Sequence, residues 1–212
     1  ATIEYPKDYK VGDRDFYHGE ERVLDYKNNG ENRTKAKEEK TKGSVAIIYN
    51  PKTSEYYLEQ NPRAYAIEKD RGKIRPVGGA REEGETSIET LARELGEEIE
   101  DDNAKKILIS TLKNKGHFYK KVITHEKGVT YYTDIYIIPI ESQQEWEIVK
   151  SSSLTQDGGI SRVLHGLDIL TLDNGYFASN YSEVIKEVVA QQLGGRINTN
   201  LYTKTSHLAY LN

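Results

Sequence analysis

Residues 79–98 read GAREEGETSIETLARELGEE, and this stretch decides the fold that the chain can adopt. Thr86 is a residue type that caps helix N-termini, and Glu89 follows it by three residues, which is the spacing of a capping box. The pattern predicts a helix that begins at Ser87 and covers about residues 87–100. One narrow face of this helix collects apolar side chains, namely Ile88, Leu91, Ala92, Leu95 and Ile99. We expect this face to pack against a β-sheet.

The opposite side of the predicted helix carries acidic side chains. Glu94, Glu97 and Glu98 are spaced i, i+3, i+4 and therefore gather on one face. Carboxylates placed in this way repel one another, and Glu98 also lies near the negative end of the helix dipole. A cation that prefers hard oxygen ligands, such as Mg²⁺ or Mn²⁺, would neutralise them. The other interpretation is a solvated acidic face, which the spacing alone favours.

The residues around this acidic face change that balance. Gly79 is followed after five residues by Glu85, and after seven more by Arg93-Glu94-Leu95-x-Glu97-Glu98. This pattern resembles the Nudix box, the signature loop and helix of the Nudix hydrolases. The box covers about a tenth of the chain, and the strands predicted around it agree with the family's α/β/α sandwich. The resemblance implies a Nudix-like α/β/α sandwich with a mixed β-sheet.

The chain departs from the family pattern just after the acidic run. The family has glycine at position 100 and an aliphatic residue at 101, where this chain has Glu100 and Asp101. Without the glycine that ends the helix in a left-handed cap, we expect the helix to run on to Asp102 and to cap at Asn103. Glu100→Gly would then place glycine inside a helix and destabilise the protein by about 0.5–1 kcal/mol.

The resemblance implies a metal-dependent enzyme that hydrolyses a phosphoric anhydride bond, with Mg²⁺ as cofactor and Mn²⁺ as a substitute. It assigns Glu94, Glu97 and Glu98 to the metal, with Glu85 joining them directly or through the metal's water shell. Glu94 is alternatively the general base, because members of the family differ in this role. Arg93 would orient the carboxylates through charge-assisted hydrogen bonds. The candidate catalytic residues are therefore Glu94, Arg93 and Glu97.

The implied substrate is a nucleoside diphosphate linked to another moiety, such as ADP-ribose, a sugar nucleotide or a dinucleoside polyphosphate. Gly78 and Gly79 are candidate substrate-binding residues, because glycine lets the backbone turn tightly beside a phosphate. Tyr119 matches a tyrosine that diadenosine-polyphosphate members have after the box. The residues before 44 instead look like the extension of ADP-ribose or sugar-nucleotide members, where it helps to form a homodimer. Acidic candidates for a catalytic loop before the last helix are Glu141, Glu145, Glu147 and Asp157.

The remaining pattern divides the chain into an N-terminal extension (residues 1–43), a Nudix hydrolase domain (44–195) and a C-terminal tail (196–212). Within the extension, residues 22–26 form a candidate short strand and residues 28–42 are expected to be an exposed loop. Apolar runs bounded by turn residues predict strands, and helical spacing predicts a closing helix. The predicted strands are residues 44–49, 54–60, 107–112, 117–124 and 130–140, and the closing helix is 182–193.

Composition limits the classes of function. The chain has 212 residues and a formal net charge of −4, so no overall basic excess indicates nucleic-acid binding. It has no cysteine, which excludes thiolate catalysis and cysteine–zinc sites. No signal pattern or membrane-spanning apolar run is evident, so we expect a cytoplasmic enzyme without membrane contact. The alternatives are a non-catalytic, nucleotide-sensing Nudix module and an RNA-cap pyrophosphohydrolase.

Overall fold

The computed structural model describes residues 23–26, 39–155, 159–179 and 181–194. The expected C-terminal tail and residues 28–38 of the expected exposed loop lie outside the described residues. Within the segment 1–43, two parts join the sheet. Residues 23–26 form a short strand, as the apolar run predicted. Residues 39–42 belong to a strand that continues to Asn50, so the expectation of a loop is wrong for these four residues, although Lys40 and Lys42 are exposed as expected.

The strands form one mixed, eight-stranded sheet, in the order β1-β6-β7-β2-β3-β4, with β5 paired to β2 and β8 to β3. The pairs β1–β6 and β2–β7 are parallel, and the other pairs are antiparallel. The strands are β1 (Val23–Tyr26), β2 (Glu39–Asn50), β3 (Glu55–Gln60), β4 (Ile74–Arg75), β5 (Val77–Ala80), β6 (His117–Glu126), β7 (Val129–Pro139) and β8 (Ile160–His165). The predicted hairpin of residues 44–60 and the predicted strands 117–124 and 130–140 are confirmed.

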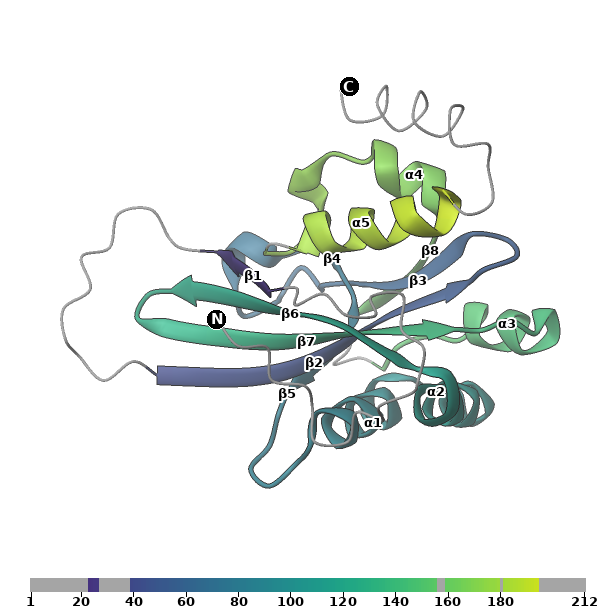
Figure 1. The fold of residues 1–212 in the computed structure, drawn as a ribbon, viewed down its shortest axis with the longest axis horizontal. Helices are drawn as coiled ribbons and strands as arrows, with labels where there is room; N and C mark the ends of the chain where they lie inside the picture. Colours follow the sequence, from purple (N-terminus) through teal and green to yellow (C-terminus); the bar gives the residue numbers. More distant parts are fainter. Residues whose placement is uncertain (1–22, 27–38, 156–158, 180, 195–212) are drawn as a thin grey trace.

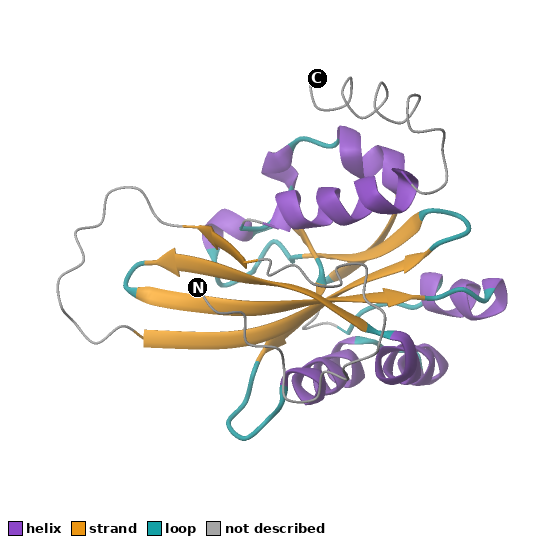
Figure 2. Ribbon diagram, viewed as in Figure 1, coloured by secondary structure: helices purple, strands orange, loops and turns teal. Residues whose placement is uncertain are grey.

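Helices cover both faces of this sheet, as Figures 1 and 2 show. One face carries α1 (Ser87–Glu98), α2 (Asp102–Lys115) and α3 (Gln143–Lys150), and the other carries α4 (Gly166–Thr171) and α5 (Tyr181–Gly194). Two single turns of 3-10 helix, η1 (Glu68–Asp70) and η2 (Asn174–Tyr176), lie in connecting segments. None of the described helices is long and apolar enough to cross a membrane. The arrangement is the three-layer sandwich that the box predicted.

The two faces of the sheet bury separate hydrophobic clusters. Along β2, Val45 and Ile47 contribute to the cluster under α5, whereas Ala46 and Ile48 contribute to the cluster under α1 and α2. Successive side chains of a strand point to opposite faces, so a strand covered on both faces reads as an unbroken apolar run.

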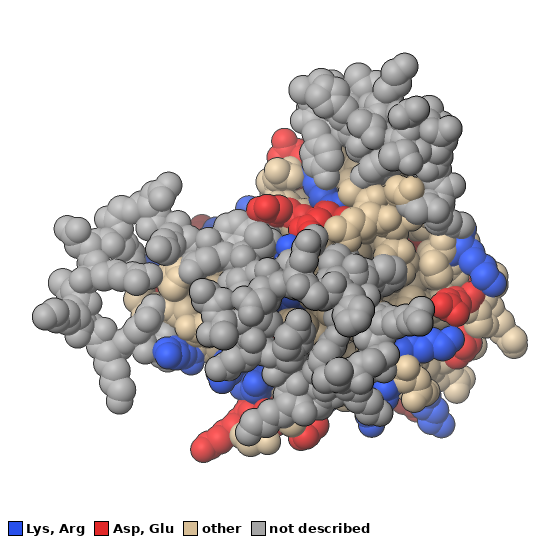
Figure 3. Space-filling view, in the orientation of Figure 1, with Lys and Arg blue, Asp and Glu red and all other residues tan. Residues whose placement is uncertain are grey.

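On the visible surface in Figure 3, acidic and basic side chains of the described residues are interspersed.

The segment 107–112 is helical, so the predicted strand is wrong. Residues 102–115 form α2, whose N-cap Asp101 accepts a hydrogen bond from the backbone N–H of Ala104 (2.8 Å). Ala104, Leu108 and Leu112 recur every four residues and are buried under the sheet. A short apolar run fits either a strand or a buried helical segment, and here the flanking cap and the four-residue spacing decide for the helix.

The expected extension of the box helix is also wrong. The last residue of α1 is Glu98, and its C-cap Ile99 has an extended backbone (φ −80°, ψ 128°). The backbone N–H of Glu100 donates to the carbonyl of Ser153 (3.0 Å), which holds the connector in this extended form. Because Glu100 lies between two helices, Glu100→Gly would neither supply a left-handed cap nor interrupt a helix. The structure thus removes the basis of the expected destabilisation.

Candidate active site

The helix α1 displays its acidic side chains because both its start and its buried face are well defined. The hydroxyl of Thr86 accepts a hydrogen bond from the backbone N–H of Glu89 (3.2 Å), as the capping box predicted. Leu91 and Leu95 are buried in the cluster between α1 and the sheet. Their burial fixes the rotation of the helix about its axis and therefore the direction in which each acidic side chain of the run leaves it, with Glu97 exposed and Glu94 and Glu98 partly buried.

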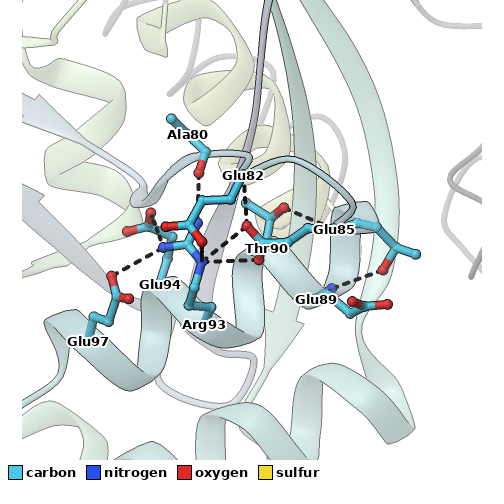
Figure 4. Close-up of polar contacts among 9 residues, drawn as sticks. Ala80, Glu82, Glu85, Glu89, Thr90, Arg93, Glu94 and Glu97 are labelled. Carbon is cyan, nitrogen blue, oxygen red and sulfur yellow. Dashed lines mark hydrogen bonds and ion pairs between the residues drawn. The ribbon is translucent and has the colours of Figure 1, made fainter.

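Arg93 lies at the centre of the loop and helix of the box (Figure 4). Its Nε lies 3.1 and 3.0 Å from the two carboxylate oxygens of Glu85. Its Nη1 donates to Glu94 (3.0 Å) and to Glu97 (3.2 Å), and its Nη2 donates to the carbonyl of Ala80 (2.8 Å). One guanidinium thus ties three of the four predicted metal ligands to the strand β5. Its hydrogen bonds also lower the pKa of Glu85 below the usual value.

The two predicted glycines are required for different reasons. Gly78 has a φ of +149°, and a Cβ there would lie 2.2 Å from the carbonyl oxygen of Ser44 on β2. A Cβ on Gly79 would lie 2.6 Å from the carboxyl carbon of Glu94. Since real Cβ contacts are essentially never so short, any larger residue at position 79 would displace the Glu94 carboxylate or the strand.

Glu98 differs from the other acidic residues of α1 because its carboxylate is turned inward. Its Oε2 is buried and has no hydrogen-bond partner among the described residues. Burial raises the pKa of Glu98 to about 8, and the charges of Glu59 and Glu94 act in the same direction. Arg75 and a hydrogen bond from the backbone of Gly78 oppose this shift. Burial also raises the pKa of Glu94, against the influence of Arg93.

The pair Glu59 and Arg75 joins the site from outside the box. The two residues are cross-strand neighbours on β3 and β4. Glu59 is only 4% exposed, and burial raises its pKa to about 7, with Arg75 opposing and Glu94 adding to the shift. The acidic residues expected outside the box do not join the site in this way: Glu141, Glu145 and Glu147 are exposed, and Asp157 lies outside the described residues. The sequence signal that could have identified Glu59 is its position in a predicted strand, where an acidic residue falls among side chains that alternate between the two faces.

A second buried network anchors the loop of the box to the sheet. Asp134 on β7 accepts hydrogen bonds from Arg81 (3.1 Å) and from the hydroxyl of Ser87 (2.7 Å), and its other oxygen lies 3.7 Å from the ammonium of Lys121. The hydroxyls of Ser87 and Ser44 are 2.9 Å apart. Ser87, the first residue of α1, and Arg81, the first residue of the loop after β5, are therefore both bonded to the carboxylate of Asp134.

The residues present fit a divalent cation, although their side chains are arranged around Arg93. Among the described residues, no three acidic or histidine side chains surround a common point as a ligand set would. Yet Glu98 has a buried oxygen without a partner, and Glu94 is half-buried against Gly79. A buried carboxylate that lacks partners is unfavourable unless a cation neutralises it. Hard oxygen donors of this kind suit Mg²⁺ and Mn²⁺.

A pocket of about 190 Å³ is lined in part by Arg75. Its wall combines aromatic and polar side chains, which include Asn61, Tyr65, Asp70, Arg75, Tyr131 and Tyr181. Asp70 is held in place by Ser179, whose backbone N–H and hydroxyl both donate to its carboxylate (2.9 and 3.1 Å). Arg75 thus lines the pocket and also acts electrostatically on the carboxylates. It donates a hydrogen bond to the carbonyl of Gly78 (3.0 Å).

Tyr119, the third predicted substrate-binding residue, lies in the hydrophobic cluster under α5 and is 3% exposed. The pocket wall includes Val122 and Thr124 of the same strand instead. The role of Tyr119 therefore stays a prediction, while the structure brings Gly78 and Gly79 directly against the carboxylate site.

Comparison with known proteins shows the fold. No protein-family model and no curated protein matches the chain. The MutT protein from Methanosarcina mazei Go1 has a similar structure, with 14% identity, a TM-score of 0.54 and coverage of 74% of this chain and 98% of its own. The E. coli dihydroneopterin triphosphate pyrophosphohydrolase is less similar, at 13% identity and a TM-score of 0.47 over 71% and 92% of the two chains. The Nudix-like α/β/α sandwich expected from the sequence is confirmed.

Proposed function

We propose that this chain is a divalent-metal-dependent hydrolase that cleaves a pyrophosphate bond in a nucleoside diphosphate linked to another moiety. The observation that carries the proposal is the inward-turned carboxylate of Glu98, which accepts a hydrogen bond from the backbone of Gly78 but has a buried oxygen, Oε2, without a partner among the described residues. It lies in a loop and helix whose spacing matches the Nudix box, and in the fold of a MutT protein. A helix made only for stability gains nothing from such a carboxylate.

The four carboxylates of the box divide into two roles in this proposal. Glu94 and Glu98 would hold the cation, with Glu97 and Glu85 reaching it when Arg93 releases them. A bound cation would neutralise the pyrophosphate charge and polarise its phosphorus–oxygen bonds. Arg93 is a positioning residue, since its hydrogen bonds end on carboxylates and on the Ala80 carbonyl. Glu94 remains the alternative candidate for the general base.

We place the organic part of the substrate in the pocket beside Arg75. Its tyrosines offer flat apolar surface with polar edges, which suits a nucleoside or a sugar. Because Arg75 lines the pocket and its charge also acts on Glu94 and Glu98, a ligand there would direct its phosphate toward the proposed cation site. Planar, charged donors of this kind are well suited to phosphate groups.

Hydrolysis of a substrate panel tests this function. The full chain would be incubated with ADP-ribose, sugar nucleotides, diadenosine polyphosphates, dinucleotides and capped RNA, and the products identified by mass spectrometry. We expect cleavage with Mg²⁺ or Mn²⁺, none in excess EDTA, and recovery when metal is restored. Turnover that persists in EDTA would contradict the proposal. Nucleotide binding without turnover would instead indicate a sensing module.

The variant Glu98→Gln locates the metal site within this assay. Removing one ligand charge should lower activity by about a hundredfold or more, because electrostatic stabilisation worth several kcal/mol is lost. The matched control is Glu100→Gln, an exposed glutamate two residues farther along, which should keep wild-type activity. Equal activities of Glu98→Gln and the wild type would place the metal site elsewhere.

A further inference from the structure

Glu59 lies on the face of the sheet that α1 covers. Side chains alternate along a strand, so Glu59 shares its face of β3 with Tyr57. Tyr57 is buried in the same cluster as Leu91 and Leu95 of α1. The side chain of Glu59 therefore enters the layer between the sheet and α1 from the strand side. Glu98 enters the same layer from the helix side, although the two residues are far apart in the sequence.

The carboxylates of Glu59 and Glu98 share an unusual condition. Glu59 is 4% exposed and its Oε2 has no hydrogen-bond partner among the described residues, which is equally true of Oε2 of Glu98. The charge of Glu59 acts on Glu98, and the charge of Glu94 acts on both groups. Buried polar atoms are almost always hydrogen-bonded, so two unpartnered carboxylate oxygens in one place require an explanation.

Arg75 provides only part of that explanation. It stands opposite Glu59 in the strand pair, and its charge favours the ionised form of Glu59. Its hydrogen bonds, however, go to the carbonyls of Pro76 (3.2 Å) and Gly78 (3.0 Å). The charge of this one guanidinium, which is hydrogen-bonded to carbonyls, acts on three carboxylates, those of Glu59, Glu94 and Glu98. One guanidinium cannot balance all three carboxylates if they ionise, and the buried oxygens of Glu59 and Glu98 still lack partners.

We propose that Glu59 is a further ligand of the divalent cation, supplied by β3 to the same ion as Glu98. This inference rests on the proposed function, because it assumes that α1 binds a cation at all. A cation between the two elements would satisfy both buried oxygens and offset the charge that Arg75 leaves uncompensated. It would also link β3 to α1, so that metal binding would stabilise the packing of the helix on the sheet.

Binding of Mn²⁺ alone tests the proposal without reference to catalysis. Free Mn²⁺ would be measured by electron paramagnetic resonance during titration of the full-length chain, without nucleotide. We expect Glu59→Gln to weaken Mn²⁺ binding by tenfold or more. The matched control is Glu55→Gln on the same strand, because Glu55 is already paired with Lys150 (2.8 Å) and with the indole of Trp146 (3.0 Å). This control should bind Mn²⁺ like the wild type.

Thermal unfolding separates a ligand from a structural partner of Arg75. If Glu59 binds the ion, Glu59→Gln should melt in chelator at or above the wild-type temperature and gain less from Mn²⁺. A lower melting temperature in chelator together with unchanged Mn²⁺ affinity would overturn the proposal. Glu59→Asp keeps the charge but withdraws the oxygens by one methylene group. It should also bind Mn²⁺ more weakly, whereas wild-type affinity would show that only the charge is needed and would overturn the proposal.

The same titration keeps the two proposals apart. If the wild-type chain binds no Mn²⁺, the proposed function fails and this inference fails with it. If Glu98→Gln weakens Mn²⁺ binding while Glu59→Gln and Glu59→Asp do not, only the role of Glu59 is refuted.

Discussion

Position 79 carries no side chain because the carboxylate of Glu94 occupies the space where a Cβ would lie. All three nearest heavy atoms belong to that carboxylate, at 2.6 to 2.8 Å. The adjacent Gly78 is constrained by backbone instead, through its φ of +149° and its approach to Ser44. Two successive glycines in one turn thus serve different purposes, and only Gly79 acts directly on a candidate catalytic group.

Gly79→Ala should therefore impair catalysis more than folding. The added methyl group forces the Glu94 carboxylate to move, and a displacement of about 1 Å in a catalytic group costs about a hundredfold in rate. The control is Gly96→Ala on α1, where the nearest atom to a new Cβ is 4.0 Å away. It should keep full activity and gain about 0.5–1 kcal/mol of helix stability. Steady-state kinetics and thermal melting would measure both effects, and a fully active Gly79→Ala variant would contradict this role for Gly79.

At the scale of elements, the boundary between α1 and α2 carries the largest departure from the sequence-based expectation. The apolar run at residues 107–112 matches a strand, but Asp101 caps a helix and the buried residues recur every four positions. The connector between the helices is extended and bonded to Ser153, and the carbonyl of Glu98 accepts a hydrogen bond from Thr155 (2.8 Å). The segment after α3 therefore holds the C-terminal end of α1, where the proposed ligand Glu98 is the last residue.

Asp101→Ala tests this assignment. Loss of an N-cap typically costs about 1 kcal/mol, which corresponds to a fall of roughly 2–4 °C in melting temperature for a chain of this size. Asp102→Ala is the control, because Asp102 is exposed, stands in the first turn and forms only a long ion pair with Lys105 (3.6 Å). Equal melting temperatures of Asp101→Ala and Asp102→Ala would contradict a helix that begins at Asp102.

At the scale of the whole molecule, the metal-free fold carries carboxylates that resist ionisation. Burial raises the pKa of Glu98 to about 8 from the usual 4.5, so the folded chain holds this proton more tightly than the unfolded chain. The stability that this proton contributes is full below pH 4.5 and is lost as the pH rises toward about 8. Glu59, with a pKa of about 7, contributes with the same sign.

In chelator, the melting temperature should therefore fall between about pH 5.5 and pH 8.5. Glu98→Gln should show a smaller fall, because glutamine does not titrate. Mg²⁺ should reduce the fall in the wild type by favouring the ionised carboxylates, provided that the cation binds there. Thermal melts across this pH range would measure the three curves. Identical pH dependence of the wild type and Glu98→Gln would mean that Glu98 ionises normally.

The sequence by itself determined the features that depend on short-range pattern. The cap at Thr86, the apolar stripe of α1 and the acidic run could be predicted because helical periodicity and capping act within a few residues. The strands β2 and β3 were predictable because apolar runs end at turn residues. From these, the resemblance to the Nudix box was enough to predict the sandwich.

Only the tertiary structure decided what segments distant in sequence do to one another. Glu59 meets Arg75 through strand register, Gly79 meets Glu94 through the packing of α1 on β5, and Asp134 anchors Ser87 from another strand. No local pattern encodes these contacts, because each depends on which elements become neighbours in the sheet. The helical state of α2 was also decided by the tertiary structure. Its apolar run fits either a strand or a helix, and the surface of the sheet that it covers selects the helix.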